Sequence, residues 1–326
     1  MIFYPDIDNI RLNMNKAGSA NEPFLFGINY EMSEGFFISN PLLQSDILFQ
    51  LNNVGNKSSN ELEKVETFLD SKPISYIEYQ NKFNVVYKGL RRGDSFLTNL
   101  TIKTLIETNL SLSDIFRRSK SPYQLYIPDR FVCFSPERFV SITGGKVSSN
   151  PMKGTIDAAI ENAEQIILND FKETAEHNTI VDLIRNDLSM VACNVRVERF
   201  RYIDRIKSKD KEILQVSSEI TGDLEGDYHS YLGDIIFKLL PAGSISGAPK
   251  AATIDLIRSA EGEDRGYYTG IFGYYDGTDF DSAVLIRFIE QEDKRMYFRS
   301  GGGITAYSKC EDEYQEVLNK IYFPFV

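Results

Sequence analysis

The sequence predicts an α+β fold in which large, mostly antiparallel β-sheets pack as a sandwich with helices outside. Short stretches of alternating apolar and polar residues, bounded by Gly, Asn or Asp, are typical of strands. Segments with apolar residues at helical spacing lie between them. The two patterns do not alternate regularly, as a doubly wound parallel sheet would require, so antiparallel sheets are favoured.

The size and charge of the chain limit its organisation and its partners. With 326 residues, 42% of them hydrophobic, it is long enough for one large domain or two smaller ones. We predict a strand-rich segment over residues 1–74 that packs on a main domain over residues 75–326, with residues 52–60 as the best linker candidate. The net charge of -11 and the lack of Lys/Arg runs argue against nucleic acid or an anionic membrane as a partner.

The cysteines and histidines indicate the compartment and the kind of metal site. Cys133, Cys193 and Cys310 are odd in number and widely spaced, so a reducing cytoplasm fits better than a disulfide framework. We find neither a secretory signal nor a run of about 18 apolar residues. His177 and His229 are the only histidines, and we expect His177 to be a structural hydrogen-bonding group, so a metal would be held by carboxylates.

Individual elements follow from the patterns in chain order. Residues 24–32 and 124–134 are predicted to be strands. Asn60 is a plausible cap for a helix over residues 61–70, and residues 162–189 have helical spacing.

The stretch from Glu137 to Lys153 predicts two strands joined by a turn at Gly144 and Gly145. Such a hairpin can bring its two ends together. If both side chains enter a pocket, the carboxyl can act as acid or base and the amine as nucleophile or base. The alternative is an ordinary ion pair on the surface.

Two helical segments each carry a pair of glutamates three residues apart. Glu173 and Glu176 share one helix face, and Glu313 and Glu316 share another, after Ser308 as a plausible cap. Each pair alone could be a solvated acidic face. Together they predict a four-carboxylate site for a hard divalent ion such as Mg²⁺.

Two glycine-rich segments are candidates for ligand contact. In "PAGSISGAPK" Gly247 is followed by Ala248, not by the Lys-Ser/Thr of a nucleotide P-loop, yet glycines before a helix can still bind an anion. Gly301, Gly302 and Gly303 let the backbone approach a ligand closely, or make a tight turn.

Two further side chains belong to the candidate site. Arg287 lies in an apolar stretch, where a guanidinium needs an anionic partner, either a structural Glu or Asp or a substrate carboxylate. Tyr268 belongs to the neighbouring stretch "RGYYTGIFGYYDG".

Together these stretches resemble the chorismate-utilising enzymes, the family of anthranilate synthase component I, aminodeoxychorismate synthase component I, and the isochorismate and salicylate synthases. The resemblance runs from about residue 75 to the C-terminus and implies a fold like that of anthranilate synthase component I. Its motifs, in the family's order, are "SPERF", "PMKGT", "AEHNTIVDLIRNDL", "PAGSISGAPK", "RGYYTGIFGYYDG" and "GGGITAYS" followed by "EYQEVLNK". The lysine of "PMKGT" and the stretch "GDSFLTNLT" look like aminodeoxychorismate synthases, since anthranilate synthases usually have alanine at the lysine position.

The resemblance implies a reaction and a role for each residue. Lys153 would attack chorismate, Glu137 would be the general acid and base, and ammonia would come from a glutamine amidotransferase subunit. Glu176 and Glu316 would bind Mg²⁺, with Glu173 and Glu313 holding its waters. The family positions that contact substrate are Ser244, Tyr268, Arg287, Gly301, Gly302, Gly303 and Lys320.

The chain departs from the family pattern at three positions. Gln215 replaces a histidine that lyase members use in pyruvate elimination, which favours amination over anthranilate or salicylate formation. Ser149 and Asn150 replace a common Thr-Arg pair, which bears on the orientation of this loop. The alternatives are anthranilate synthase component I, another chorismate-converting enzyme, or a non-catalytic chorismate-binding subunit.

Overall fold

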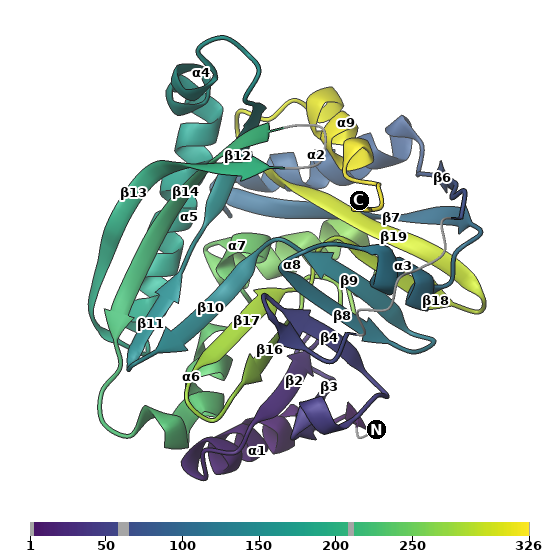
Figure 1. Cartoon of the computed structure of the whole chain (residues 1–326). Coiled ribbons are helices and arrows are strands. Elements are labelled where there is room, and N and C mark those ends of the chain that lie inside the picture. Colours follow the sequence, from purple (N-terminus) through teal and green to yellow (C-terminus); the bar gives the residue numbers. More distant parts are fainter. Residues whose placement is uncertain (1–2, 58–64, 208–211, 326) are drawn as a thin grey trace.

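Two antiparallel sheets that pack face to face make the centre of the molecule (Figure 1). The computed structural model describes residues 3–57, 65–207 and 212–325. Helices cover the outer faces, as the α+β sandwich predicted from the sequence requires.

The first sheet joins the N-terminus to the middle and the C-terminal third of the chain. Its order is β1 (Phe3–Tyr4), β3 (Gly35–Ser39), β2 (Phe24–Ile28), β16 (Ile271–Tyr275), β17 (Phe280–Val284), β10 (Arg138–Thr143), β11 (Lys146–Ser149), β14 (Glu212–Asp223) and β12 (Met152–Asp157), with β13 (Cys193–Lys207) also paired to β14. Strand β2 pairs with β16 along its whole length, with Phe24 opposite Tyr275.

The second sheet borders the candidate site through residues of β19. Its order is β15 (Gly247–Ala248), β7 (Leu97–Thr108), β19 (Arg295–Ile304), β18 (Phe288–Glu292), β9 (Phe131–Ser135), β8 (Tyr123–Ile127), β4 (Leu48–Leu51) and β5 (Val54–Gly55), with β6 (Leu69–Lys72) paired to β7. The register of β7 and β19 places Gly301 opposite Thr101 and Gly303 opposite Asn99.

Alternation of side chains along the strands builds two cores. Leu25 of β2 packs between the sheets with Phe272 and Phe131, whereas Phe24 and Phe26 point to the outer face of the first sheet. Since each of these residues is fully or almost fully buried, β2 is covered on both faces, which explains its continuous apolar sequence.

The helices divide between the two sheets. Those on the first sheet are α1 (Ile7–Ser19), α5 (Phe171–Ser189) and α6 (Leu232–Leu239), with α4 (Ala163–Asn169) beside β12, and α7 (Gly243–Ser246) packs between α5 and β7 of the second sheet. Those on the second sheet are α2 (Tyr76–Arg92), α8 (Lys250–Glu261), α9 (Cys310–Asn319) and α3 (Leu112–Arg118). Two short 3₁₀ helices, η1 (Pro41–Leu43) and η2 (Tyr228–Tyr231), complete the described elements.

Several boundaries differ from the sequence predictions. The helical stretch 162–189 is broken at Asp170, whose carboxylate accepts the Glu173 N–H and so begins a new helix, α5. The helix predicted over 61–70 is wrong where the structure describes it, because residues 65–68 have no regular structure and strand β6 follows. The predicted cap of this helix, Asn60, lies outside the described residues, as do residues 58–60 of the predicted linker 52–60.

Two smaller corrections concern caps and strand ends. Ser308 is not the cap of the last helix, since α9 begins at Cys310 after Lys309, and the Ser308 hydroxyl accepts the Thr305 N–H instead. The strand predicted over 24–32 ends at Ile28. Residues 124–134 form the two strands β8 and β9 of one hairpin.

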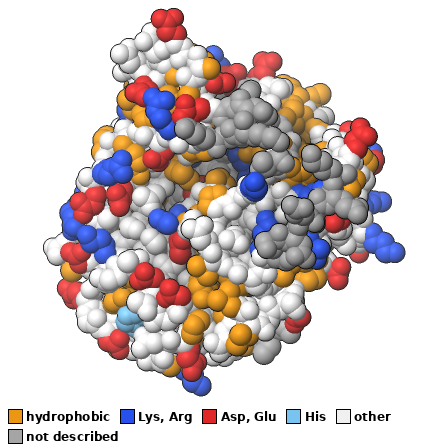
Figure 2. All heavy atoms as spheres, viewed as in Figure 1, with side chains coloured by type: hydrophobic (Ala, Val, Ile, Leu, Met, Phe, Trp, Pro, Cys, Tyr) orange, Lys and Arg blue, Asp and Glu red, His pale blue; other side chains and the backbone are white. Residues whose placement is uncertain are grey.

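The surface agrees with the mixed composition of the chain. Figure 2 shows acidic and basic side chains interspersed over one face of the molecule. None of the described helices combines the length and the apolar character needed to cross a membrane.

Candidate active site

A cavity of about 690 Å³ gathers residues that are far apart in the sequence. Strands β12 and β19 and helices α5, α7 and α9 contribute to its walls. The predicted site residues that line it are Glu137, Lys153, Glu173, Glu176, Ser244, Tyr268, Arg287, Gly301, Gly302, Gly303, Glu316 and Lys320. Glu313 is the one predicted site residue that does not line the cavity directly. It is buried beneath the lining residues, with 1% of its surface exposed.

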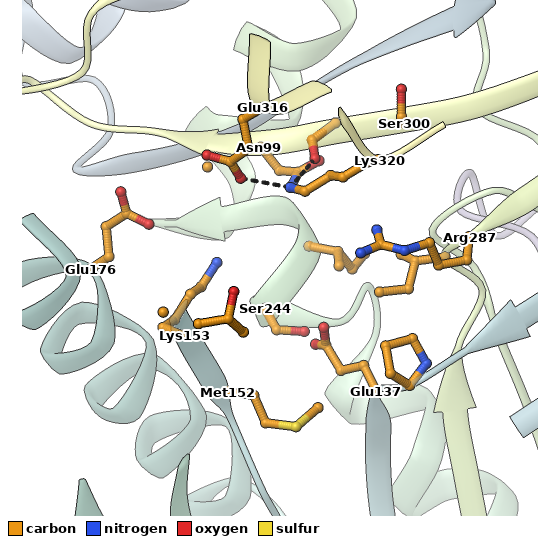
Figure 3. Close-up of a pocket in the computed structure, with 18 of the residues that line it drawn as sticks. Asn99, Glu137, Met152, Lys153, Glu176, Ser244, Arg287, Ser300, Glu316 and Lys320 are labelled. Carbon is orange, nitrogen blue, oxygen red and sulfur yellow. Dashed lines mark hydrogen bonds and ion pairs between the residues drawn. The ribbon is translucent and has the colours of Figure 1, made fainter. Parts of the chain in front are cut away.

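Lys153 enters the cavity from an irregular strand. It is opposite Val216 of β14, and the register shifts between Lys153 and Thr155. The residue between them, Gly154, has φ of 76°, which favours glycine. A Cβ on Gly154 would also lie 3.1 Å from Glu173 Oε2. This bulge turns the lysine side chain into the cavity beside α5 (Figure 3).

Glu137 lies at the other end of the predicted hairpin. The returning strand is interrupted after β11, and β12 continues along the same partner, with Ser149 opposite Ile220 and Met152 opposite Ser217 of β14. The Glu137 carbonyl accepts the Val284 N–H at 3.2 Å, which ties this residue to β17. Figure 3 shows the carboxyl of Glu137 directed toward the same space as Lys153.

The loop between the two strands is held by the residues that depart from the family pattern. Ser149 Oγ donates to the Phe139 carbonyl at 2.9 Å, and Asn150 Oδ1 accepts from Arg138 Nη1 at 3.2 Å. Both bonds join the returning strand to β10, so Ser149 and Asn150 fix the orientation of the loop that leads to Lys153.

Glutamates from two helices form an acidic wall, which we define as Glu173, Glu176, Glu313 and Glu316. The first two come from α5 and the last two from α9, as the i, i+3 spacing predicts. A Cβ on Gly302 would lie 3.5 Å from Glu316 Oε1 and 3.6 Å from Glu313 Oε2. A Cβ on Gly303 would lie 3.5 Å from Glu176 Oε2, so three of the four carboxylates gather around one stretch of β19, and Glu173 lies beside Gly154 of β12.

Burial and neighbouring lysines act in opposite directions on this wall. Burial raises the pKa of Glu176 to about 7, although Lys153 and Lys172 oppose the shift. Burial also raises the pKa of Glu173. At Glu316 burial is outweighed by the Lys320 ammonium, 2.7 Å from Oε1, so its pKa falls.

The glycines of β19 keep the cavity open. They lie inside strand β19 (Arg295–Ile304), so the alternative of a tight turn is wrong. A Cβ on Gly303 would approach Glu176 Oε2 to 3.5 Å and Lys153 Nζ to 3.8 Å. A side chain at this position would thus fill the space between the lysine and the acidic wall.

The remaining predicted substrate contacts lie around the same cavity. Ser244 is in α7, Tyr268 is 3% exposed, and Lys320 Nζ donates to the Gly301 carbonyl at 2.7 Å. Arg287 lies between β17 and β18 rather than inside an apolar strand, with φ of 53°. In the described part of the chain it has no carboxylate within ion-pair distance. Its guanidinium instead lies over the ring of Tyr322, and its Nε is 3.5 Å from the Tyr322 hydroxyl.

Several cavity residues were not found by sequence reasoning. Lys172 comes directly before Glu173 on α5, and its contacts depend on where α9 lies. Asn99 Oδ1 and Ser300 Oγ are buried beside the cavity, and neither has a hydrogen-bond partner among the described residues. The stretch "GDSFLTNLT" contains Asn99, but a single asparagine in a strand carries no signal of its own.

His177 was expected to be structural, and the structure agrees. Its Nε2 lies 2.6 Å from Ser218 Oγ, which joins α5 to β14. Burial, followed by Arg201 and Lys153, lowers the pKa of His177 to about 4, so the ring is neutral near pH 7.

Comparison with known proteins identifies the family. The model of the chorismate binding enzymes matches residues 40–325. The chain belongs to this family. The match begins well before residue 75, where the resemblance of the motifs begins, and it includes strands β4 to β6.

The curated relatives include proteins named as anthranilate synthase component 1 and as aminodeoxychorismate synthase component 1. An uncharacterised PabA-like protein of Pasteurella multocida (strain Pm70) is 48% identical over 95% of this chain and 96% of its own length. Anthranilate synthase component 1 of Acetivibrio thermocellus is 34% identical over 71% of this chain and 49% of its own length. Aminodeoxychorismate synthase component 1 of Bacillus subtilis (strain 168) is 33% identical over 71% of this chain and 51% of its own length.

A solved structure supports the fold assignment. The isochorismate synthase DhbC of Bacillus anthracis, described as putative and 2,3-dihydroxybenzoate-specific, superposes with a TM-score of 0.74. It is 19% identical and covers 98% of this chain and 89% of its own. At this identity the likeness concerns the fold alone.

The acidic wall suits a divalent ion in its chemistry. Mg²⁺ prefers carboxylate oxygens, and two buried oxygens here, Glu176 Oε1 and Glu313 Oε2, have no hydrogen-bond partner in the part of the chain that the structure describes. However, within residues 3–57, 65–207 and 212–325 no group of three or more His, Cys, Asp or Glu side chains is arranged so that it could hold a metal ion. Lys172 Nζ lies among the glutamates, 2.7 Å from Glu313 Oε1 and 3.9 Å from Glu176 Oε1.

Proposed function

We propose that the chain aminates chorismate to 4-amino-4-deoxychorismate, for the synthesis of para-aminobenzoate and folate. The observation that supports this most is Lys153, which a glycine bulge turns into the cavity beside Glu176 of the acidic wall and across from Arg287. Its "PMKGT" motif and the likeness to an aminodeoxychorismate synthase component 1 support the same reaction.

The reaction is a double displacement on the ring. The neutral Lys153 amine forms a bond to ring carbon 2, the ring double bonds shift, and the hydroxyl on carbon 4 leaves as water with a proton from Glu137. Ammonia then forms a bond to carbon 4 and expels the lysine, and Glu137 takes up the excess proton. One ammonia enters and one water leaves, so no oxidant or reductant is needed.

The charged groups around the cavity would hold the substrate. Arg287 and Lys320 offer cations to the carboxylates of chorismate, and Ser244 and Tyr268 offer hydroxyls. Glu176 and Glu316 would bind Mg²⁺, with Glu173 and Glu313 holding its waters. The ion would neutralise the wall and anchor the ring carboxylate.

Gln215 supports amination without loss of pyruvate. It lies on β14 opposite Thr155 and lines the cavity. An amide cannot accept or deliver a proton as imidazole does, so no base replaces the family histidine at this position. The alternative is an anthranilate synthase reaction, as in the relative from Acetivibrio thermocellus, in which pyruvate is lost.

Ammonia would be supplied by a glutamine amidotransferase subunit that associates with this chain. We also propose that the protein works in the cytoplasm, where Cys133, Cys193 and Cys310 would stay reduced, as all three are free.

Replacement of Lys153 tests the covalent route. With chorismate, Mg²⁺ and ammonium salts, Lys153→Ala should lower the rate of amination by about 10³-fold or more, because the adduct cannot form. Lys146→Ala is the matched control, since Lys146 is an exposed lysine on β11 of the same sheet and should leave the rate unchanged.

The two variants also separate chemistry from folding. Both should unfold at the temperature of the unchanged protein, because neither lysine makes an ion pair among the described residues. Undiminished turnover by a folded Lys153→Ala variant would rule out the lysine adduct.

A further inference from the structure

Lys172 has an unusual position for a basic residue. It is the second residue of α5, where the positive end of the helix dipole disfavours a cation. It nevertheless lies in the acidic wall, with Nζ 2.7 Å from Glu313 Oε1 on the other helix. The contact with α9, and not the stability of its own helix, accounts for this placement.

The pairing of Lys172 leaves the wall incompletely satisfied. Its ammonium lies within hydrogen-bond distance of one oxygen of Glu313, and its distance to Glu176 Oε1 is 3.9 Å. Glu313 Oε2 and Glu176 Oε1 stay buried, with no hydrogen-bond partner in the described segments of the chain. A purely structural ion pair would satisfy these atoms, since unpaired buried carboxylate oxygens are costly.

Lys172 also has room to leave. About a third of its side chain is exposed, whereas Glu313 is 1% exposed and Glu176 7%. A lysine has a flexible four-carbon stem, so it can move its charge to water while the glutamates stay in place.

Lys320 pairs with Glu316, and we propose that Lys172 is the internal counter-cation of the Glu313 side of the acidic wall, which holds Glu313 in the metal-free protein and must release it when a divalent ion binds. This inference rests on the magnesium site of the proposed function. With Glu176 bound to the ion and Glu313 holding one of its waters, the Lys172 ammonium would lie close to a divalent cation. The two cations repel each other strongly, so the ammonium and the ion exclude each other. Lys172 therefore sets the concentration of Mg²⁺ at which the site fills.

Mg²⁺ titration of three proteins tests the exchange. We expect Lys172→Met to bind Mg²⁺ about tenfold more tightly than the unchanged protein in calorimetric titrations, because no internal cation has to be displaced. Lys103→Met is the matched control, since Lys103 also lies between two glutamates, 2.6 Å from Glu292 and 3.3 Å from Glu290. Its affinity for Mg²⁺ should not change.

A second measurement needs no variant. Acetylation of lysines by acetic anhydride, followed by peptide mass analysis, should show that Lys172 reacts faster with Mg²⁺ than without it, because its ammonium has moved to solvent. Lys103 should react at the same rate in both conditions.

The outcomes separate this inference from the proposed function. If the three proteins bind Mg²⁺ with equal affinity, or if Lys172→Met binds it more weakly, the role of Lys172 is wrong while the metal site stands. If Mg²⁺ binds but Lys172 is acetylated at the same rate with and without it, the proposed exchange is also wrong. If none of the proteins binds Mg²⁺, both the inference and the magnesium site fail.

Discussion

Two buried charge clusters in this molecule contrast with each other. Glu261 and Arg265 form an ion pair at 2.6 Å with exposures of 2% and 1%, and neither has a buried side-chain atom without a partner. The acidic wall has four carboxylates, two orphan oxygens and a lysine that is one-third exposed. The first cluster is closed, and the second is open to a ligand.

The closed pair connects the segments that carry the site. Arg265 donates to the carbonyls of Asn99 at 2.7 Å and Ile245 at 3.1 Å, and Glu261 Oε1 accepts the Thr101 N–H at 2.9 Å. Asn99 and Ile245 line the cavity. Complete satisfaction of a buried pair thus indicates a structural role, whereas the unsatisfied carboxylate oxygens of the acidic wall support the proposal that this cluster binds a divalent ion.

Breaking the closed pair should have the largest effect on stability. Glu261→Gln removes the charge opposite Arg265 and leaves a buried guanidinium uncompensated. The free energy of unfolding should fall by about 3–5 kcal/mol, measured by urea denaturation. The double variant Glu261→Leu with Arg265→Met should recover part of this loss of stability. If Glu261→Gln is as stable as the unchanged protein, the closed pair does not have the structural role that distinguishes it from the acidic wall.

The corresponding change in the open cluster should act on the ion instead. Glu313→Gln should weaken Mg²⁺ binding by about 10 to 100-fold. Without Mg²⁺ the free energy of unfolding should change by less than about 1 kcal/mol, because loss of the Lys172 pair is offset by relief of repulsion among the glutamates. Glu311→Gln, at an exposed position of the same helix, is the control and should change neither quantity.

Lys57, which has no carboxylate partner within residues 3–57, 65–207 and 212–325, gives an effect on stability that depends on pH. Lys57 Nζ donates to the Ser119 carbonyl and to Gln124 Oε1, both at 2.7 Å. Burial, with a smaller contribution from Lys120, lowers the pKa of Lys57 to about 8. Its ordinary pKa is 10.5, so between these two values the unfolded chain binds more protons than the folded one.

The free energy of unfolding should therefore gain a positive contribution as pH rises from about 8 to 10.5. Urea denaturation of the unchanged protein and of Lys57→Met at several pH values measures this contribution. Lys57→Met should lack this contribution. If the free energies of unfolding of the two proteins depend on pH in the same way, the lowered pKa of Lys57 is not its source.

The sequence predicts local patterns and motif residues, but not their partners. The i, i+3 glutamate pairs and the turn at Gly144 and Gly145 follow from local periodicity and glycine chemistry, and both are present. The pairing of β2 with β16 joins residues about 250 positions apart, and no local pattern encodes it.

The same limit explains what was missed at the site. Lys172 is adjacent to Glu173 in the sequence, yet its partner Glu313 is on another helix. The position of Arg287 after β17, and the inclusion of the three glycines in β19, depend on where neighbouring strands end. Motifs identify residues, whereas contacts between distant elements decide which charges are satisfied.

The product formed from chorismate, Mg²⁺ and ¹⁵N-ammonium tests the central proposal most directly. Mass analysis should show 4-amino-4-deoxychorismate that carries one ¹⁵N and retains its enolpyruvyl group, with no free pyruvate in the reaction. Fluorescent anthranilate with an equal amount of pyruvate, or a product without ¹⁵N, would contradict it.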